Sequence, residues 1–348
     1  MTNTSTPLID SDVHCAVTRD DLMPYVSEYW RETLETTNQR EPGSPAMTYP
    51  DWNTALRTRK GDLSLDRLRT DVLDDASYAI LYCYYGVEAV THPYRAEVTA
   101  TAVNRWLQEH WLDQDSRLRA SAVVTPQYPE MAVREIERVA EDPRFVQILL
   151  PARAPAGYGH QQYWPILRAA ERHGLRVAIT AGGGSGAPPT PVGWAGSFYE
   201  EYNLAPTLFQ SHILSLVMSG IFAECPDLRV VLAESGWTWL PPLMWRMDQE
   251  WKAVHREVPW VKDAPSSYVR SFFKLTTQPF DSPESPAHLR ALLDHIGSDD
   301  MLMYSSDYPH KYLHGNDELL SVPALESREK IRWRTAAALY GLDVRDGG

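Results

Sequence analysis

Short apolar or β-branched runs alternate along the chain with stretches in which apolar residues recur at helical spacing. Eight such runs predict strands, at Pro7–Val13, Tyr78–Tyr82, Leu118–Val124, Phe145–Leu150, Arg176–Ala181, Arg229–Ala233, Phe273–Thr277 and Met301–Tyr304. Helical stripes fall between them, as in the stretch that places Ala132, Ile136 and Val139 on one face. Strands separated by helices pair in parallel, and closing them into a ring predicts an α/β fold, the (β/α)8 TIM barrel.

The clearest break in this alternation lies between Thr18 and Asp66, where Pro, Gly and Asn interrupt any regular spacing. We interpret this stretch as an insertion over or beside the mouth of the barrel, the end where the strands finish. One such barrel takes roughly 250 residues plus insertions. The 348 residues are therefore expected to form a single domain, residues 1–348.

Composition narrows the class of protein. The chain has 33 Lys and Arg against 46 Asp and Glu, a net charge of −13, which argues against nucleic acid and anionic membranes as partners. Its three cysteines are scattered with no CxxC spacing, which is typical of a reducing compartment. With no secretory leader and no apolar run of ~18 residues, we expect a cytoplasmic protein with a small-molecule partner. Assembly into a homo-oligomer stays open.

Polar residues that could carry chemistry stand where predicted strands end, which is where barrel enzymes place their sites. Asp12 and His14 share one face of the first strand and could chelate a divalent ion. Asp307 and His310 follow the last strand, so Asp307 could bind metal and move a proton, and His310 could position substrate or act as an acid. Glu234 ends a buried run and needs a cation or a donor there; a salt bridge to a barrel arginine is the alternative.

Four segments together resemble the amidohydrolase superfamily, in the branch that contains the aminocarboxymuconate-semialdehyde-type decarboxylases. They read DSDVH, VAITAGGG, ECPDLRVVLAESGWTWLPPLMWRMD and GSDDMLMYSSDYPH, and the resemblance runs from about Leu8 to Leu342. It implies a metal-dependent TIM barrel. Asp12 and His14 match the first-strand ligands, and Asp307 matches the last-strand aspartate that binds metal and moves protons. Glu234 stands where many relatives have a histidine that acts as ligand or as acid and base.

The chain departs from this pattern at the fifth strand, where Thr180 occupies the position of a metal-ligating histidine. A threonine hydroxyl is a poor replacement for imidazole on a transition metal. Three outcomes stay open: a weaker site without that ligand, a replacement ligand such as His212, or no metal. Clustered carboxylates favour an ion, and we expect one divalent metal, with zinc first and manganese, iron or copper as other choices.

The expected substrate pocket combines Thr180 with flat apolar side chains that follow strands five, six and eight, namely Trp194, Trp237, Trp239, Tyr308 and Tyr312. We expect an enzyme that makes polar attack at a carbonyl or related carbon, with Asp307, His310 and Glu234 as catalytic residues. We expect hydrolysis of an amide or ester of a small aromatic or acyl substrate, or the related biosynthetic cyclisation.

Other functions stay open. The nearest is non-oxidative decarboxylation of an aromatic or unsaturated carboxylic acid. A carboxylate substrate needs a cation besides the metal, and Lys311 is the one obvious partner in these motifs, so decarboxylation ranks second. A metal-poor relative that binds a small molecule without turnover is a further alternative, and the acidic surface favours an interaction protein more weakly still.

Overall fold

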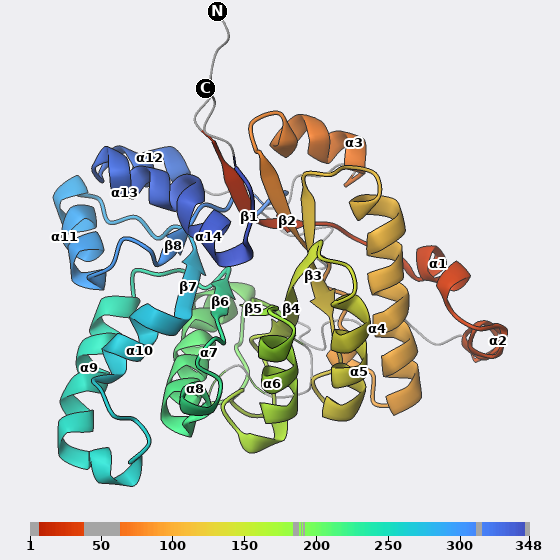
Figure 1. Cartoon of the computed structure of the whole chain (residues 1–348), viewed down its shortest axis with the longest axis horizontal. Helices are drawn as coiled ribbons and strands as arrows, with labels where there is room; N and C mark the ends of the chain where they lie inside the picture. The colour runs from red at the N-terminus through yellow and green to blue at the C-terminus, as the bar shows by residue number, and fades with distance from the viewer. Residues whose placement is uncertain are drawn as a thin grey trace, which may run out of the picture.

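The computed structural model describes residues 7–37, 63–183, 188, 190, 192–310 and 315–344. Eight parallel strands follow one another in chain order (Figure 1): β1 Ile9–His14, β2 Tyr78–Tyr82, β3 Leu118–Val123, β4 Phe145–Pro151, β5 Arg176–Thr180, β6 Val230–Ala233, β7 Phe273–Thr276 and β8 Leu302–Met303. The ring closes between β1 and the segment after β8, since Ser11 N–H donates to the Tyr304 carbonyl at 2.9 Å and Val13 pairs with Tyr308. The predicted (β/α)8 barrel is confirmed, with small shifts at the strand ends.

Helices surround this ring. Their bounds are α1 Arg19–Leu22, α2 Glu28–Thr36, α3 Leu65–Leu68, α4 Pro93–Leu107, α5 Pro129–Val139, α6 Trp164–Arg172, α7 Phe198–Ser219, α8 Ile221–Glu224, α9 Leu240–Val254, α10 Pro265–Phe272, α11 Pro286–Ile296, α12 Asn316–Ser321, α13 Leu325–Glu329 and α14 Thr335–Tyr340. Short 3₁₀ turns lie at Met23–Tyr25, Val87–Ala89, Gln161–Tyr163 and His255–Glu257, and π-helical turns at Arg69–Leu73, Gln108–Leu112 and Lys330–Arg334. In the described ranges no helix combines the length and apolarity that crossing a bilayer requires.

Alternation along the strands divides the core into two layers. In β5, Val177 and Ile179 join the outer layer under the helices, whereas Ala178 faces the barrel interior. In β6, Val231 and Ala233 face the interior in the same way. Successive strand residues point to opposite faces. The interior-facing residues at the carboxyl end of each strand therefore lie next to the mouth of the barrel.

The C-terminal segment closes the other end of the barrel. Ala336, Ala337 and Leu339 of α14 belong to the interior layer. Arg176, at the start of β5, donates from Nε to the carbonyl of Leu339 at 2.8 Å, which fixes α14 at the amino ends of the strands. Chemistry that needs access from solvent is therefore confined to the carboxyl ends.

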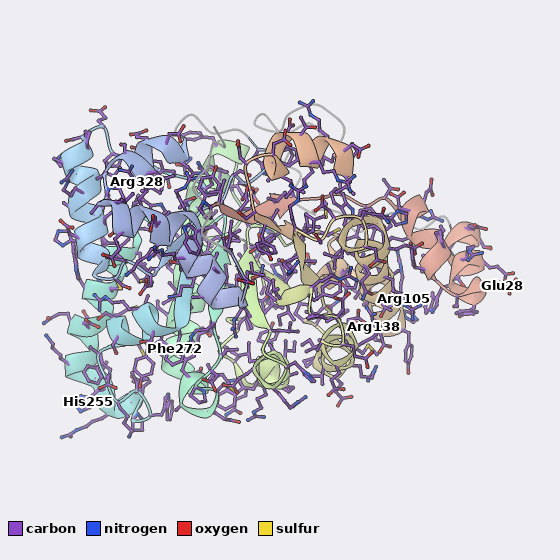
Figure 2. The ribbon with its side chains drawn as sticks, turned by 45° about the horizontal axis from the view of Figure 1, so that its top comes forward. Glu28, Arg105, Arg138, His255, Phe272 and Arg328 are labelled. Atoms are coloured by element: carbon purple, nitrogen blue, oxygen red, sulfur yellow. The ribbon has the colours of Figure 1, made fainter. Side chains whose placement is uncertain are left out.

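The described part of the predicted insertion lies beside the barrel wall, against α4 (Figure 1). Trp30 of α2 packs its ring 5.4 Å from that of His92, the residue that caps α4. Figure 2 shows Glu28, at the start of α2, on the outer edge of the molecule. Residues 38–62 lie outside the described residues, so the expected cover over the mouth stays a prediction, as does the single-domain boundary.

Candidate metal centre

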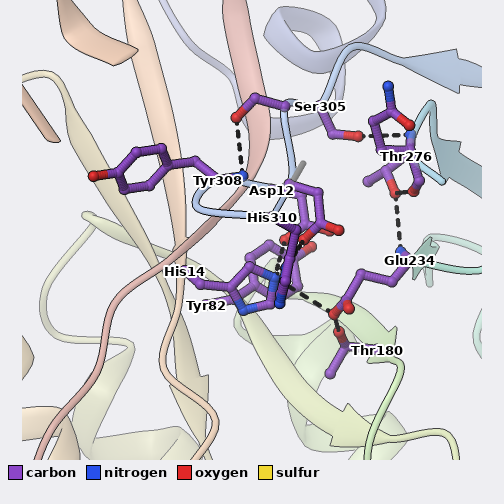
Figure 3. A network of polar contacts seen from close by, with 12 residues as sticks. Asp12, His14, Tyr82, Thr180, Glu234, Thr276, Ser305, Tyr308 and His310 are labelled. Atoms are coloured by element: carbon purple, nitrogen blue, oxygen red, sulfur yellow. Dashed lines mark hydrogen bonds and ion pairs between the residues drawn. The ribbon is translucent and has the colours of Figure 1, made fainter. Parts of the chain in front are cut away.

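Four titratable side chains meet at the carboxyl end of the barrel (Figure 3). His14 comes from the end of β1, Glu234 follows β6, and Asp307 and His310 follow β8. Each offers one ligand atom, and these atoms all lie within 4.8 Å of one another. Three strands that are distant in sequence thus place two imidazoles and two carboxylates in the volume of one ion.

His14 is the centre of the cluster. Its Nε2 atom lies 2.7 Å from Oδ1 of Asp307, 3.4 Å from Oδ1 of Asp12 and 3.6 Å from Oε1 of Glu234. His310 reaches the same Oδ1 atom of Asp307 from its Nδ1 atom at 3.0 Å. Asp12, His14, Glu234 and Asp307, the four ligands that the motifs indicate, therefore lie in or next to this group.

Local backbone geometry aims these side chains inward. Ala233 already faces the interior, so strict alternation would turn Glu234 outward, but its left-handed φ of 57° breaks the alternation. Asp307 also has a positive φ, 54°. In β1 the register with β2 shifts between Asp10 and Val13, which lets both Ile9 and His14 face the interior. Non-glycine residues in the left-handed region carry strain, and such residues concentrate at functional sites.

Electrostatics in the cluster call for positive charge. Burial alone would lower the pKa of His14, but Glu234, Asp307 and Asp12 raise it to about 10. Burial would raise the pKa of Asp307, yet His310 and His14 outweigh it and hold that pKa below its usual range. Burial, reinforced by Asp307, raises the pKa of Glu234 and lifts that of Asp12 well above its usual value. Three carboxylates thus crowd around the imidazole of His14, and a divalent cation would relieve that excess of negative charge.

Asp12 supplies a second sign that the residues present fit a cation. Its side chain is fully buried, and neither carboxylate oxygen accepts a hydrogen bond from any described residue. Buried polar atoms are nearly always satisfied, by protein, water or an ion. Carboxylate oxygens beside imidazole nitrogens are the donor set that Mn²⁺ and Zn²⁺ accept.

Thr180 borders the cluster, and its hydroxyl contacts one of the two carboxylates in it. Its Oγ1 atom donates to Oε1 of Glu234 at 2.6 Å, across the paired ends of β5 and β6. The hydroxyl is thereby committed to positioning a carboxylate. The fifth-strand position of this chain orients Glu234 where the resemblance implies a metal ligand.

His212 lies elsewhere, in the middle of α7, and the structure argues against it as the replacement ligand. Its Nδ1 atom accepts from the backbone N–H of Tyr158 at 3.3 Å, and its Nε2 atom bonds the carbonyl of Ala152 at 2.7 Å. Its ring stacks on that of Tyr158 with centroids 4.6 Å apart. Burial lowers the pKa of His212 to about 4, so it is a neutral, fully bonded core histidine.

The aromatic residues expected to form a common pocket have separate surroundings. Trp237 is fully buried and stacks on Phe280 in the outer core layer, which removes it from any solvent-facing surface. Trp239 donates from Nε1 to the carbonyl of Ser235 at 2.9 Å. Trp194 is half exposed, and Figure 3 shows the ring of Tyr308 directed away from the cluster. Lys311 and Tyr312 lie outside the described residues.

The structure adds two residues that the motifs do not indicate. Tyr82 pairs with His14 in the register of β1 and β2, and their rings lie 6.2 Å apart (Figure 3). Its position at the end of the predicted second strand could have indicated that it lies near the site. Arg153, just beyond β4, is a buried cation at this end of the barrel, paired with Glu201 and 5.8 Å from the ring of Trp194. A lone arginine after a strand has no distinctive spacing, so only the fold could bring it into view.

Comparison with proteins of known sequence agrees with this architecture. The chain is 28% identical over 320 residues to a γ-resorcylate decarboxylase of Polaromonas sp. JS666, a match that covers 84% of this chain and 91% of that protein. It is 27% identical over 278 residues to the γ-resorcylate decarboxylase of Rhodococcus jostii, covering 74% of this chain and 80% of that one.

Solved structures give the same picture of the fold. A dihydroxybenzoic acid decarboxylase of Polaromonas sp. JS666, with bound manganese and 2-nitroresorcinol, superposes with a TM-score of 0.70 at 23% identity over 98% of both chains. A 5-carboxyvanillate decarboxylase of Novosphingobium aromaticivorans, also with manganese, gives 0.73 at 20% identity over 98% of this chain and 97% of that one. Residues 65–342 match the family model Amidohydro_2, described as amidohydrolase. The chain therefore belongs to this amidohydrolase family of enzymes.

Proposed function

We propose that this protein is a divalent-cation-dependent, non-oxidative decarboxylase of an aromatic carboxylic acid. The γ-resorcylate decarboxylases to which it is similar over most of its length support this reaction class. The motifs alone rank amide or ester hydrolysis first, and the relatives favour the reaction ranked second.

The reaction sets defined demands on the site. The bond between a ring carbon and the carboxylate carbon breaks, carbon dioxide leaves, and the electron pair of that bond stays on the ring carbon. One proton must then reach that carbon. No water is consumed, so the site needs a held carboxylate and a proton donor at the ring face.

Within this chain, the position and surroundings of Glu234 are the observation that carries the proposal. Its side chain reaches the cluster, Thr180 bonds one of its oxygens, and burial raises its pKa, so it holds a proton more readily than an ordinary glutamate. Its side chain is also 15% exposed, which allows exchange with solvent. Glu234 can therefore deliver the proton to the ring carbon and recover another from water.

Asp12, His14 and Asp307 are the residues that would hold the cation, with Glu234 beside it. The oxygen-rich donor set suits Mn²⁺, and manganese is bound in two of the structurally similar decarboxylases, so we favour it over the zinc expected from the motifs. When bound, the cation stabilises negative charge that develops on substrate oxygens and the conjugated ring.

The decisive experiment compares two reactions in one preparation. Metal-free protein reloaded with Mn²⁺ is incubated with 2,6-dihydroxybenzoate and related hydroxybenzoates, and in parallel with the matching aromatic amides and esters. We expect carbon dioxide release that a chelator abolishes. In D₂O the product should carry one deuterium at the vacated ring carbon, and Glu234→Gln should lose this incorporation together with turnover.

A different outcome would overturn the assignment. Metal-dependent cleavage of the amides or esters, without carbon dioxide release from any of the acids, would restore hydrolysis as the reaction. Turnover that persists in Glu234→Gln with unchanged deuterium incorporation would remove Glu234 as the proton donor.

A further inference from the structure

His310 is the member of the cluster whose role the family pattern leaves open. Sequence reasoning treats it as a residue that positions substrate or donates a proton. In the structure it is one of four residues whose ligand atoms all lie within 4.8 Å of one another. The cluster therefore has two imidazoles, although its fifth strand supplies none.

We propose that His310 is a direct ligand of the cation and supplies the imidazole that Thr180 does not provide. This assignment rests on the proposal that the site holds a divalent cation. The site thus has the same number of imidazole ligands as the family pattern, with one of them in the turn after β8 and none at the end of β5.

The turn after β8 makes this exchange possible. The backbone N–H of His310 donates to the carbonyl of Asp307 at 2.8 Å, which closes a tight turn and returns the imidazole toward the carboxylate. Asp307 N–H in turn donates to the carbonyl of Asp12 at 3.1 Å, so the turn is anchored to β1. Two residues three apart can therefore offer a carboxylate and an imidazole to one ion.

The contacts within the cluster are those of ligands gathered around one point. His14 Nε2 and His310 Nδ1 both approach Oδ1 of Asp307, at 2.7 and 3.0 Å. The two rings are nearly perpendicular, at 78°, with centroids 5.1 Å apart, so their nitrogens converge without the rings clashing (Figure 3). Each of these nitrogens can donate a hydrogen bond to that oxygen when it carries a proton, and when it does not, its lone pair and the carboxylate can face one cation instead.

Thr180 cannot compete for this place. Its hydroxyl donates to Glu234, and a neutral hydroxyl is a weak donor to a transition metal. The side chain at position 180 nevertheless points toward Glu234, a member of the cluster. An imidazole introduced at this position would therefore project toward the carboxylate of Glu234. This gives the proposal a rescue test.

The experiment measures ligands directly, without depending on turnover. Metal-free wild-type protein, His310→Ala and His173→Ala are titrated with Mn²⁺ against a chelator, and each is then loaded with Cu²⁺ for electron paramagnetic resonance. His173 is an exposed histidine at the end of α6 and serves as the matched control. We expect nitrogen hyperfine coupling from two imidazoles in the wild type and the control, and from one in His310→Ala.

Loss of His310 should also weaken Mn²⁺ binding by about tenfold or more, because removal even of a residue that only supports a ligand costs 10–100-fold. The double variant Thr180→His with His310→Ala should regain the second nitrogen and most of the affinity. Circular dichroism and thermal unfolding of the metal-free proteins check that each variant is folded.

Unchanged nitrogen coupling and unchanged Mn²⁺ affinity in His310→Ala would overturn the assignment and leave His310 as a residue that contacts substrate. That result, with chelator-sensitive decarboxylation in the wild type, would leave the proposed function intact. A wild-type protein that binds no Mn²⁺ would overturn both.

Discussion

Thr180 donates a hydrogen bond of 2.6 Å to Oε1 of Glu234, joining the end of β5 to the residue that follows β6. This bond favours the ionised form of Glu234 and opposes the burial that raises its pKa. Threonine at this position thus regulates how firmly Glu234 holds its proton and where its carboxyl group points.

Replacing Thr180 with valine tests that relationship, because valine keeps the shape and removes the hydroxyl. We expect kcat for decarboxylation to fall by about tenfold, since a misplaced Glu234 delivers its proton less efficiently. The free energy of unfolding should fall by about 1 kcal/mol, the usual contribution of one hydrogen bond. Equal kcat in Thr180→Val and wild type would show that this bond does not position the proton donor.

Asp307→Asn should lose activity more than stability. Asparagine keeps the volume and some hydrogen bonding but removes the charge that both imidazoles approach. We expect kcat/KM to fall by about a thousandfold, equivalent to about 4 kcal/mol, while the free energy of unfolding changes by about 1–2 kcal/mol. Urea unfolding beside steady-state kinetics measures both. A loss of stability as large as the loss in transition-state stabilisation would contradict a primarily catalytic role.

Mn²⁺ should stabilise the folded protein. A ligand that binds the native state alone raises the free energy of unfolding by about 2.7 kcal/mol at a hundred times its Kd. Calorimetry with and without Mn²⁺, and again after a chelator, should show a reversible rise in Tm. The same addition to Asp12→Asn should give a smaller rise, because that variant removes a carboxylate charge from the cation site.

His212 predicts how stability depends on pH. Its pKa is about 4 in the folded protein, below the ordinary 6.5, because burial disfavours the charged ring. The stability gained by keeping His212 neutral is therefore fully present above about pH 6.5. It is lost as the pH falls toward 4, which lowers the free energy of unfolding by up to about 3 kcal/mol. Urea titrations at pH 8 and pH 5 should show a larger loss in wild type than in His212→Gln. An equal pH dependence in both proteins would assign it to other groups.

The ring of strands could be predicted because both of its faces are buried, which leaves apolar runs such as Val230–Ala233 that are easy to recognise. The pairing of Asp12 with His14 also follows from alternation alone. His310 enters the ion cluster through a turn whose path no periodicity describes. Glu234 reaches it through a left-handed backbone angle that the sequence gives no reason to expect at a glutamate.

The aromatic pocket could not be predicted, because position after a strand does not decide which layer a side chain joins. Trp237 packs into the outer core on Phe280, a partner from beyond β7. Thr180 shows the same limit at the site itself. The family pattern places a metal ligand at this position. Only the contact with Glu234 shows that Thr180 bonds a carboxylate instead.

The closure of the barrel by α14 has a consequence for how the chain folds as it is synthesised. Ala336, Ala337 and Leu339 complete the interior layer, and the edge of β1 that does not face β2 finds its partner only in the segment after β8. The first strand must therefore wait, with one edge unpaired, until nearly the whole chain has left the ribosome. A chain that terminates before α14 exposes the apolar interior of its barrel, so we expect it to be recognised as misfolded and degraded.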